Sequence, residues 1–154
     1  MTSYQDRQLI DRMLEESRVI AVVGLSPDPE RASHYVSAYL QQHGYRIIPV
    51  NPVVAGTRLL GEHVYSTLTL AAAALAEQQT RIDLVDVFRR AEEVAPMAEE
   101  AIAIGTRGLW MQLGGANETA AKRARAAGLA VVMDRCIKIE HARWRDQQRL
   151  DAQP

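Results

Sequence analysis

The sequence predicts an α/β fold: a Rossmann-like three-layer sandwich with a five-stranded parallel sheet. Short runs of β-branched apolar residues alternate with longer segments whose apolar residues recur at helical spacing. The runs are apolar without alternation, which is typical of parallel strands buried on both faces. The 154 residues, 47% of them hydrophobic, contain no repeat and no break in composition, so we expect one domain over residues 1–154.

Most predicted elements carry a local signal for their start or end. The spacing of Ser3 and Asp6 suits a capping box for the first helix. Ser33 and Asn117 are expected to cap later helices, and Pro96 suits the first position of another. In chain order we predict helix 3–16, strand 19–23, helix 33–43, strand 45–50, a polar loop over 53–62, a short connection with one or two helical turns over 65–75, strand 82–88, helix 96–104, strand 108–113, helix 117–127, strand 129–133 and helix 137–150.

Two aspartates are unusual within the predicted strand 82–88. We expect Asp83 at the entrance of that strand. Asp86 requires hydrogen-bond partners or a position near an edge, because an unpaired carboxylate is costly to bury.

Charge and composition exclude several classes of function. A net charge of -1 and a pI near 6.4 provide no broad basic field, so we expect no nucleic-acid partner. The single cysteine, Cys136, excludes an internal disulfide and any multi-cysteine metal site, and the four histidines are too scattered to predict a metal pair. The sequence has no apolar run of about 18 residues and no signal-peptide pattern. We therefore expect a cytoplasmic protein without a membrane partner.

The turn after the first strand has the properties of an anion-binding site. Gly24 breaks the strand, and backbone N–H groups around Leu25 and Ser26 are expected to be free. The hydroxyls of Ser26 and Ser33 and the guanidinium of Arg31 add further donors. The alternative is that Ser33 only caps its helix and Arg31 is only solvated. The concentration of donors in one turn favours an anion site at the carboxyl end of the sheet, where such folds bind ligands.

The turn argues against a dinucleotide. Only the first glycine of G-x-G-x-x-G is present, and Asn51 and Pro52 follow the second strand where an acidic residue would bind ribose. The sequence also lacks G-x-x-x-x-G-K-[ST]. An oxidoreductase that binds NAD(P) therefore remains only as an alternative.

Six segments together carry a family resemblance: VVGLS with ERAS after it, YRIIPVNP, DLVDVFR, LWMQLG and VVMDRCIKIEH. In order and spacing they resemble the small stand-alone CoA-binding proteins of bacteria. These proteins share a Rossmann-like fold with the CoA-binding domain of the succinyl-CoA synthetase alpha subunit. The resemblance runs from about residue 19 to residue 141 and implies a pocket for coenzyme A.

The resemblance implies roles for residues at several strand ends. The phosphates would contact Gly24, Leu25, Ser26, Arg31 and Ser33, and the adenosine end would be bordered by Asn51 and Pro52. The nucleotide or pantetheine path would be lined by Val87, Phe88 and Arg89. The pantetheine arm would lie along Gln112 and Gly114.

The sequence departs from the family pattern at one position. Many members place a lysine directly after the Asn-Pro pair, where this chain has Val53. Arg58, in the same loop, is the cation expected to replace it near the adenosine end.

No catalytic constellation is recognisable from the spacing of nucleophiles and bases. We therefore expect a non-catalytic carrier, sensor or partner module that binds CoA or an acyl-CoA, with no protein partner identified. A further alternative is an interaction module whose nucleotide pocket has degenerated.

Cys136 carries a separate hypothesis. It follows a predicted strand on the ligand side of the sheet, beside Arg135 and Lys138, which favour a thiolate. One interpretation is that it forms a mixed disulfide with CoA when oxidised. The interpretation we prefer is a small, buried, inert thiol.

Overall fold

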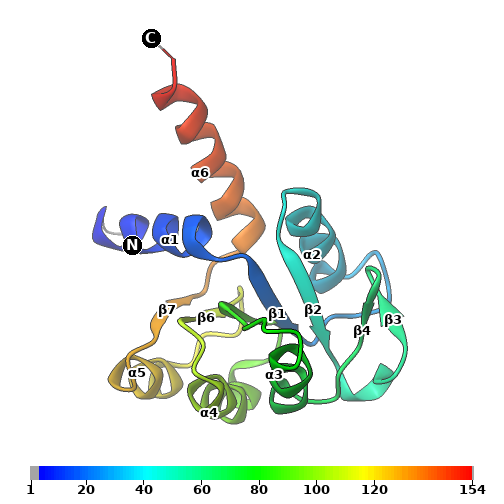
Figure 1. Ribbon diagram of the computed structural model, residues 1–154. Helices are drawn as coiled ribbons and strands as arrows, with labels where there is room; N and C mark the ends of the chain where they lie inside the picture. The colour runs from blue at the N-terminus through cyan, green and yellow to red at the C-terminus, as the bar shows by residue number, and fades with distance from the viewer. Residues whose placement is uncertain (1–3, 154) are drawn as a thin grey trace.

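The computed structural model describes residues 4–153 and confirms the predicted fold class (Figure 1). Five parallel strands form one sheet in the order β2-β1-β5-β6-β7. They are β1 (Val19–Val23), β2 (Arg46–Val50), β5 (Leu84–Val87), β6 (Gly108–Met111) and β7 (Ala130–Met133). The helices are α1 (Tyr4–Glu16), α2 (Ala32–Gln42), α3 (Leu68–Ala76), α4 (Val94–Ile104), α5 (Glu118–Ala126) and α6 (Ile137–Asp151).

The sheet lies between two helical layers. Helices α3, α4 and α5 cover one face, and α1, α2 and α6 cover the other (Figure 1). Successive strand residues point to opposite faces, so Val85 packs toward α3–α5 and Leu84 packs toward the other layer. Each face has its own buried apolar cluster, which explains why most strand residues are apolar without alternation.

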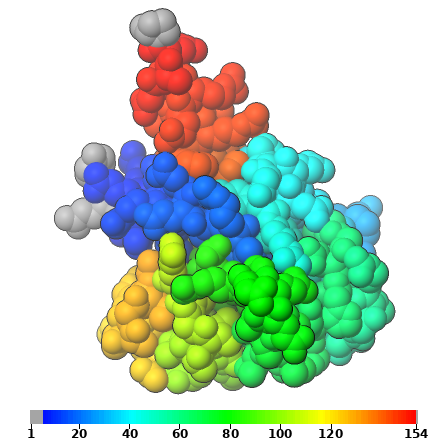
Figure 2. All heavy atoms as spheres, in the orientation of Figure 1, coloured from blue at the N-terminus to red at the C-terminus, as the bar shows by residue number. Residues whose placement is uncertain are grey.

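Helix α6 lies only partly on the body of the molecule. In its first turns, Ile137 belongs to the apolar cluster on the sheet and His141 packs against the ring of Tyr39 in α2; both are buried. Its later turns extend beyond the rest of the protein, away from α1 and α2 (Figures 1 and 2). Within residues 4–153, no helix combines the length and the apolar character required to cross a bilayer.

The region between β2 and β5 differs from the prediction. The expected loop contains a short antiparallel hairpin, β3 (Arg58–Leu59) and β4 (Glu62–His63), preceded by a 3-10 turn, Pro52–Val54. The short connection predicted next is the nine-residue helix α3, which Thr67 caps by accepting a hydrogen bond from the N–H of Leu70. Two-residue strands have too few side chains to show a period, so the hairpin carries no sequence signal.

Several predicted helix starts are also shifted. Helix α2 begins at Ala32 with Arg31 in the cap position, so Ser33 is not its cap. Helix α4 begins at Val94, so Pro96 is its third residue rather than its first. Proline is tolerated there because the N–H groups of the first turn have no partner within the helix. Asn117 does cap α5, accepting from the N–H of Ala120 at 3.0 Å. The capping box predicted at Ser3 lies outside the described residues.

The two strand aspartates have different surroundings. Asp83 lies at the strand entrance as predicted, where its Oδ2 accepts hydrogen bonds from the backbone N–H groups of Arg18 and Val19, both at 2.9 Å. Asp86 does not lie near an edge. It occupies the middle strand between Val22 of β1 and Trp110 of β6, and it is 0% exposed.

Candidate functional site

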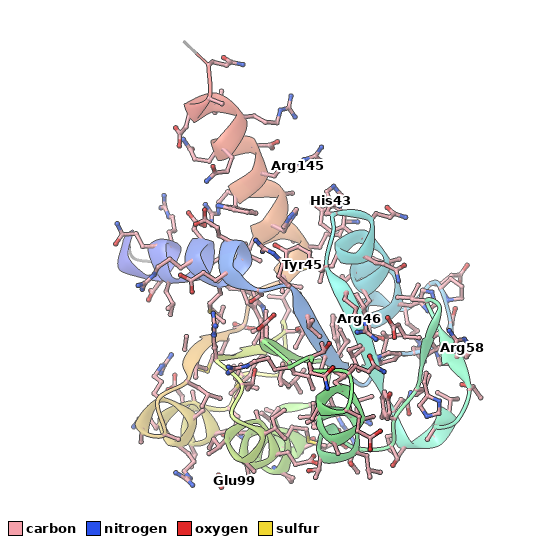
Figure 3. All side chains as sticks on the ribbon, viewed as in Figure 1. His43, Tyr45, Arg46, Arg58, Glu99 and Arg145 are labelled. Carbon is pink, nitrogen blue, oxygen red and sulfur yellow. The ribbon has the colours of Figure 1, made fainter. Side chains whose placement is uncertain are left out.

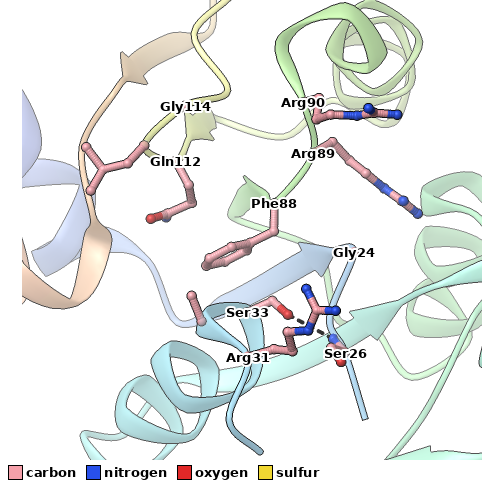
Figure 4. A pocket seen from close by; sticks show the side chains of 11 residues that line it. Gly24, Ser26, Arg31, Ser33, Phe88, Arg89, Arg90, Gln112 and Gly114 are labelled. Carbon is pink, nitrogen blue, oxygen red and sulfur yellow. Dashed lines mark hydrogen bonds between the residues drawn. The ribbon is translucent and has the colours of Figure 1, made fainter. Parts of the chain in front are cut away.

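A cavity of about 410 Å³ opens where β1, β5 and β6 end (Figure 4). We call it the strand-end cavity. Its walls come from the turn after β1, the start of α2, and the segments that follow β5 and β6. The lining residues are Gly24, Ser26, Arg31, Ala32, Ser33, Phe88, Arg89, Arg90, Gln112, Leu113 and Gly114. The carboxyl edge of the sheet is the expected position of a ligand site in this fold class.

Gly24 lets β1 end directly against the end of β5. Its φ of +88° lies in the left-handed region, and its N–H donates to the carbonyl of Val50 at 2.8 Å. A Cβ at this position would come within 2.5 Å of the carbonyl oxygen of Phe88. Glycine is therefore required on two counts, backbone conformation and close approach.

Two serine hydroxyls accept hydrogen bonds from backbone N–H groups of the turn. The N–H of Ser26 donates to Oγ of Ser33 at 2.9 Å, and the N–H of Asp28 donates to Oγ of Ser26 at 3.1 Å. The expectation that the Ser26 amide is free is therefore wrong, because the Ser33 hydroxyl occupies it. The amides of Leu25 and of Ala32, at the start of α2, make no hydrogen bond within residues 4–153. The turn consequently keeps free N–H groups and the positive end of a helix.

Two of the three arginines in the lining make no ion pair with any described residue. Arg90 pairs with Glu92 and Glu93 at 3.6 and 3.3 Å. Arg31 and Arg89 make no ion pair within the described part of the chain, and the buried Nε of Arg89 has no hydrogen-bond partner there. Figure 4 shows both of these guanidinium groups on the side of the cavity where Gly24 lies. Their positive charge is therefore available to a ligand.

The other side of the cavity is less polar. The ring of Phe88 lies in the middle of the lining, with Gln112 and Gly114 on the side away from the arginines (Figure 4). Leu113 adds an exposed apolar side chain. One side can thus accept an anion, and the other can accept an uncharged chain.

Gln112 connects this cavity to the interior. It is 5% exposed, its Nε2 donates to Oδ1 of Asp86 at 2.5 Å, and its Oε1 accepts from the N–H of Ile137 at 3.3 Å. Burial raises the pKa of Asp86 to about 7, although the bond from Gln112 acts in the opposite direction. The second carboxyl oxygen of Asp86, Oδ2, is fully buried and has no hydrogen-bond partner within residues 4–153.

Several predicted site residues do not line the cavity. Leu25 and Val87 are 0% exposed, because their side chains point into the two apolar cores. Asn51 holds the turn instead: its Nδ2 donates to the carbonyl of Leu25 at 3.0 Å, and its Oδ1 accepts from the N–H of Val53 at 2.9 Å. Pro52 starts the exposed 3-10 turn beside it.

The predicted replacement cation is used elsewhere. Arg58 lies in the β3–β4 hairpin and donates to the carbonyl of Gly61 in the same hairpin. Val53 is 87% exposed, and neither residue lines the strand-end cavity.

Cys136 is half-buried at the start of α6 and packs against the α1–α2–α6 core. It does not line the cavity, although the next residue, Ile137, is hydrogen-bonded to Gln112.

Three further residues line the cavity, namely Ala32, Arg90 and Leu113. The sequence assigned them no individual role, but they lie in segments 24–33, 87–90 and 112–115, which the strand-end rule marks as candidates for ligand contact. Within residues 4–153, no three histidine, cysteine or acidic side chains are grouped so that they could hold a metal ion.

Comparison with known proteins agrees with the geometry. A family model described as a CoA binding domain matches residues 18–142. The uncharacterized protein YneT of Bacillus subtilis (strain 168) is 42% identical over 133 residues, which cover 86% of this chain and 92% of YneT. The structure of a hypothetical protein from Pyrococcus horikoshii OT3 is similar, with 34% identity, a TM-score of 0.79, and coverage of 90% of this chain and 91% of that one.

A larger protein shares the fold. The apo form of the dinucleotide-forming acetyl-coenzyme A synthetase 1 of Ca. Korarchaeum cryptofilum has 20% identity and a TM-score of 0.62. The match covers 80% of this chain and 27% of that protein, and it concerns the fold alone. The family match over most of the chain, together with the relatives of similar length, confirms the predicted resemblance: this chain belongs to the CoA binding domain family.

Proposed function

We propose that the protein binds coenzyme A or an acyl-CoA in the strand-end cavity and acts as a non-catalytic carrier, sensor or partner module. The observation that carries the proposal is a pair of arginines beside the Gly24 turn, Arg31 and Arg89, which make no ion pair with the residues that the structure describes, in a member of this family. Guanidinium groups and free backbone amides suit a diphosphate.

The proposal assigns each end of the ligand to one side of the cavity. The diphosphate would contact Arg31, Arg89 and the start of α2. The pantetheine arm would run along Phe88 toward Gly114, where the lining has fewer charges. The adenosine end would extend over the surface near Asn51 and Pro52.

The non-catalytic part of the proposal rests on how the lining serines are bonded. Oγ of Ser26 and Oγ of Ser33 each accept from a backbone N–H. Within the described residues, neither hydroxyl contacts a histidine or a carboxylate that would activate it as a nucleophile. We also propose a cytoplasmic location, in line with the single cysteine, which leaves no internal disulfide.

Thermal unfolding with CoA, dephospho-CoA, acetyl-CoA and NAD, each in a separate sample, tests the proposal. A ligand present at about 100 times its dissociation constant stabilises the folded state by about 2.7 kcal/mol, which raises the melting temperature by about 5–10 °C. We expect this shift with CoA or acetyl-CoA. A shift with NAD alone would support the oxidoreductase alternative, and no shift with any ligand would support a degenerate pocket.

A further inference from the structure

A second cavity, of about 400 Å³, lies at the opposite end of the sheet from the strand-end cavity. We call it the α1–α6 cleft. It is formed by the end of α1 and the linker to β1, by the turn between α2 and β2, and by one side of α6. Figure 3 shows Tyr45 at the foot of α6 and Arg145 extending from α6 toward His43. The two cavities share no lining residue.

His141 places a hydrogen-bonding group at the inner wall of the cleft. His141 is only 4% exposed, and its Nδ1 lies 2.9 Å from the hydroxyl oxygen of Tyr39. Its Nε2 has no hydrogen-bond partner within residues 4–153, but this atom is not fully buried. Because His141 lines the cleft, we infer that Nε2 is accessible from it. Burial and the nearby His43 and Arg145 lower the pKa of His141 to about 4, so the ring is neutral at physiological pH.

Two aromatic rings of the cleft lining lie beside the His141 ring. The centroids of the Trp144 and Tyr45 rings each lie 5.6 Å from that of His141. The hydroxyl of Tyr45 donates to the carbonyl of Leu14 at 2.6 Å, so Tyr45 presents only its ring to a ligand. These two rings give one side of an otherwise polar lining an aromatic surface that a planar ligand can contact.

Arg18 supplies a fixed cation at the rim. Its Nη1 donates to the carbonyls of Glu15 and Ser17 at 2.7 and 3.0 Å, which orient the guanidinium. The remaining guanidinium N–H groups of Arg18 have no partner within the described residues, whereas Arg46, Arg123 and Arg143 are each paired with a carboxylate. The Glu15 carboxylate also lines the cleft but makes no ion pair with Arg18 there.

We propose that the α1–α6 cleft binds a small planar organic acid of the aryl carboxylate class. The ring would lie against Trp144 and Tyr45, the carboxylate would bind Arg18, and a polar substituent would hydrogen-bond to Nε2 of His141. The cleft volume is within the range of small-molecule sites. This site is separate from the CoA site and does not depend on it.

Titration of 4-hydroxybenzoate into the full-length protein, followed by ¹H–¹⁵N NMR, tests the proposal. We expect saturable shifts of the Trp144 indole and of backbone amides at 14–18, 43–45 and 141–148. The neutral analogue 4-hydroxybenzamide should bind at least about tenfold more weakly, because it cannot form the charge-assisted bond. The Arg18→Gln variant should lose about the same factor for the acid, whereas Arg12→Gln, on an exposed part of α1 outside the cleft, should bind as the wild type does.

Several results would overturn the proposal. They are shifts that do not saturate, equal affinity for the acid and the amide, unchanged affinity in Arg18→Gln, or shifts confined to the strand-end cavity. Shifts of the cleft residues on raising the protein concentration alone would instead identify a second copy of the chain as the occupant. The His141→Gln variant should also bind more weakly; if it does not fold, the Arg18→Gln result decides, because Arg18 is exposed.

Discussion

The side-chain amide of Gln112 donates a 2.5 Å hydrogen bond to the carboxyl group of Asp86, in the middle strand of the sheet. Gln112 also accepts from the N–H of Ile137, so one side chain joins β5, the wall of the strand-end cavity and the start of α6. No described residue places a cation beside this carboxyl group, and burial raises its pKa to about 7. Between about pH 4 and pH 7, Asp86 is therefore mostly protonated in the folded protein and mostly ionised in the unfolded chain.

This proton makes stability depend on pH in a definite direction. Between about pH 4 and pH 7 the folded state binds more protons at Asp86 than the unfolded state, so the free energy of unfolding falls as the pH rises through that window. We expect Asp86→Asn to remove this slope. Urea denaturation at intervals from pH 4.5 to pH 8 measures it, with exposed Asp28→Asn as the control. An unchanged slope in Asp86→Asn would contradict the prediction.

His141 contributes a slope of the opposite sign. Its pKa is lowered to about 4, so between pH 4 and about pH 6.5 the unfolded state binds more protons and the free energy of unfolding falls as the pH is lowered. The His141→Phe variant keeps a ring at this position but cannot titrate. We expect its stability to fall less on acidification than that of the wild type. The comparison is cleanest in an Asp86→Asn background, and equal acid slopes with and without His141 would refute it.

Gly24 should tolerate no side chain. Both Gly24 and Gly44 have positive φ, at +88° and +96°, but only Gly24 has a neighbour that a Cβ would meet, the carbonyl oxygen of Phe88. We expect Gly44→Ala to cost about 1–2 kcal/mol for the left-handed backbone and Gly24→Ala about 1–3 kcal/mol more for the clash. Chemical denaturation measures the free energy of unfolding of both variants, and the difference between their losses gives the cost of the contact with Phe88. Equal losses would show that the β1–β5 junction relaxes around the methyl group.

The arginines of the cavity provide a graded test of CoA binding. Arg31→Gln and Arg89→Gln each remove a guanidinium that has no acidic partner within residues 4–153, and we expect each to weaken CoA binding at least about tenfold. Arg90→Gln is the matched control, because Arg90 is exposed and already paired with Glu92 and Glu93. Calorimetric titration measures all three. A loss in Arg90→Gln as large as in the other two would indicate a general charge effect rather than a specific contact.

Cys136 is expected to remain unmodified by CoA disulfide. It is half-buried, packs against an apolar core and does not line the cavity. Intact-protein mass after incubation with CoA disulfide should therefore equal that of the untreated protein. A reducible adduct that Cys136→Ser abolishes would restore the mixed-disulfide hypothesis.

Much of the fold could be predicted because its signals are local. Each strand is a short apolar run, and a turn such as that at Gly24 follows from residue types within a few positions. Helix α3 was underestimated because its alanine-rich sequence, LTLAAAALA, has little contrast between its faces. The β3–β4 hairpin had no detectable pattern at all.

The sequence alone determined the order of the elements, the edge of the sheet where a ligand would bind and, through its motifs, the family. Tertiary structure decided which strand-end residues reach the cavity: Leu25 and Val87 turn into the cores, whereas Phe88 and Arg89 face the opening. It also decided the partner of Asp86, which is 26 residues away along the chain. Such contacts depend on how the strands align in the sheet, and a local pattern contains no information about a neighbour on another strand.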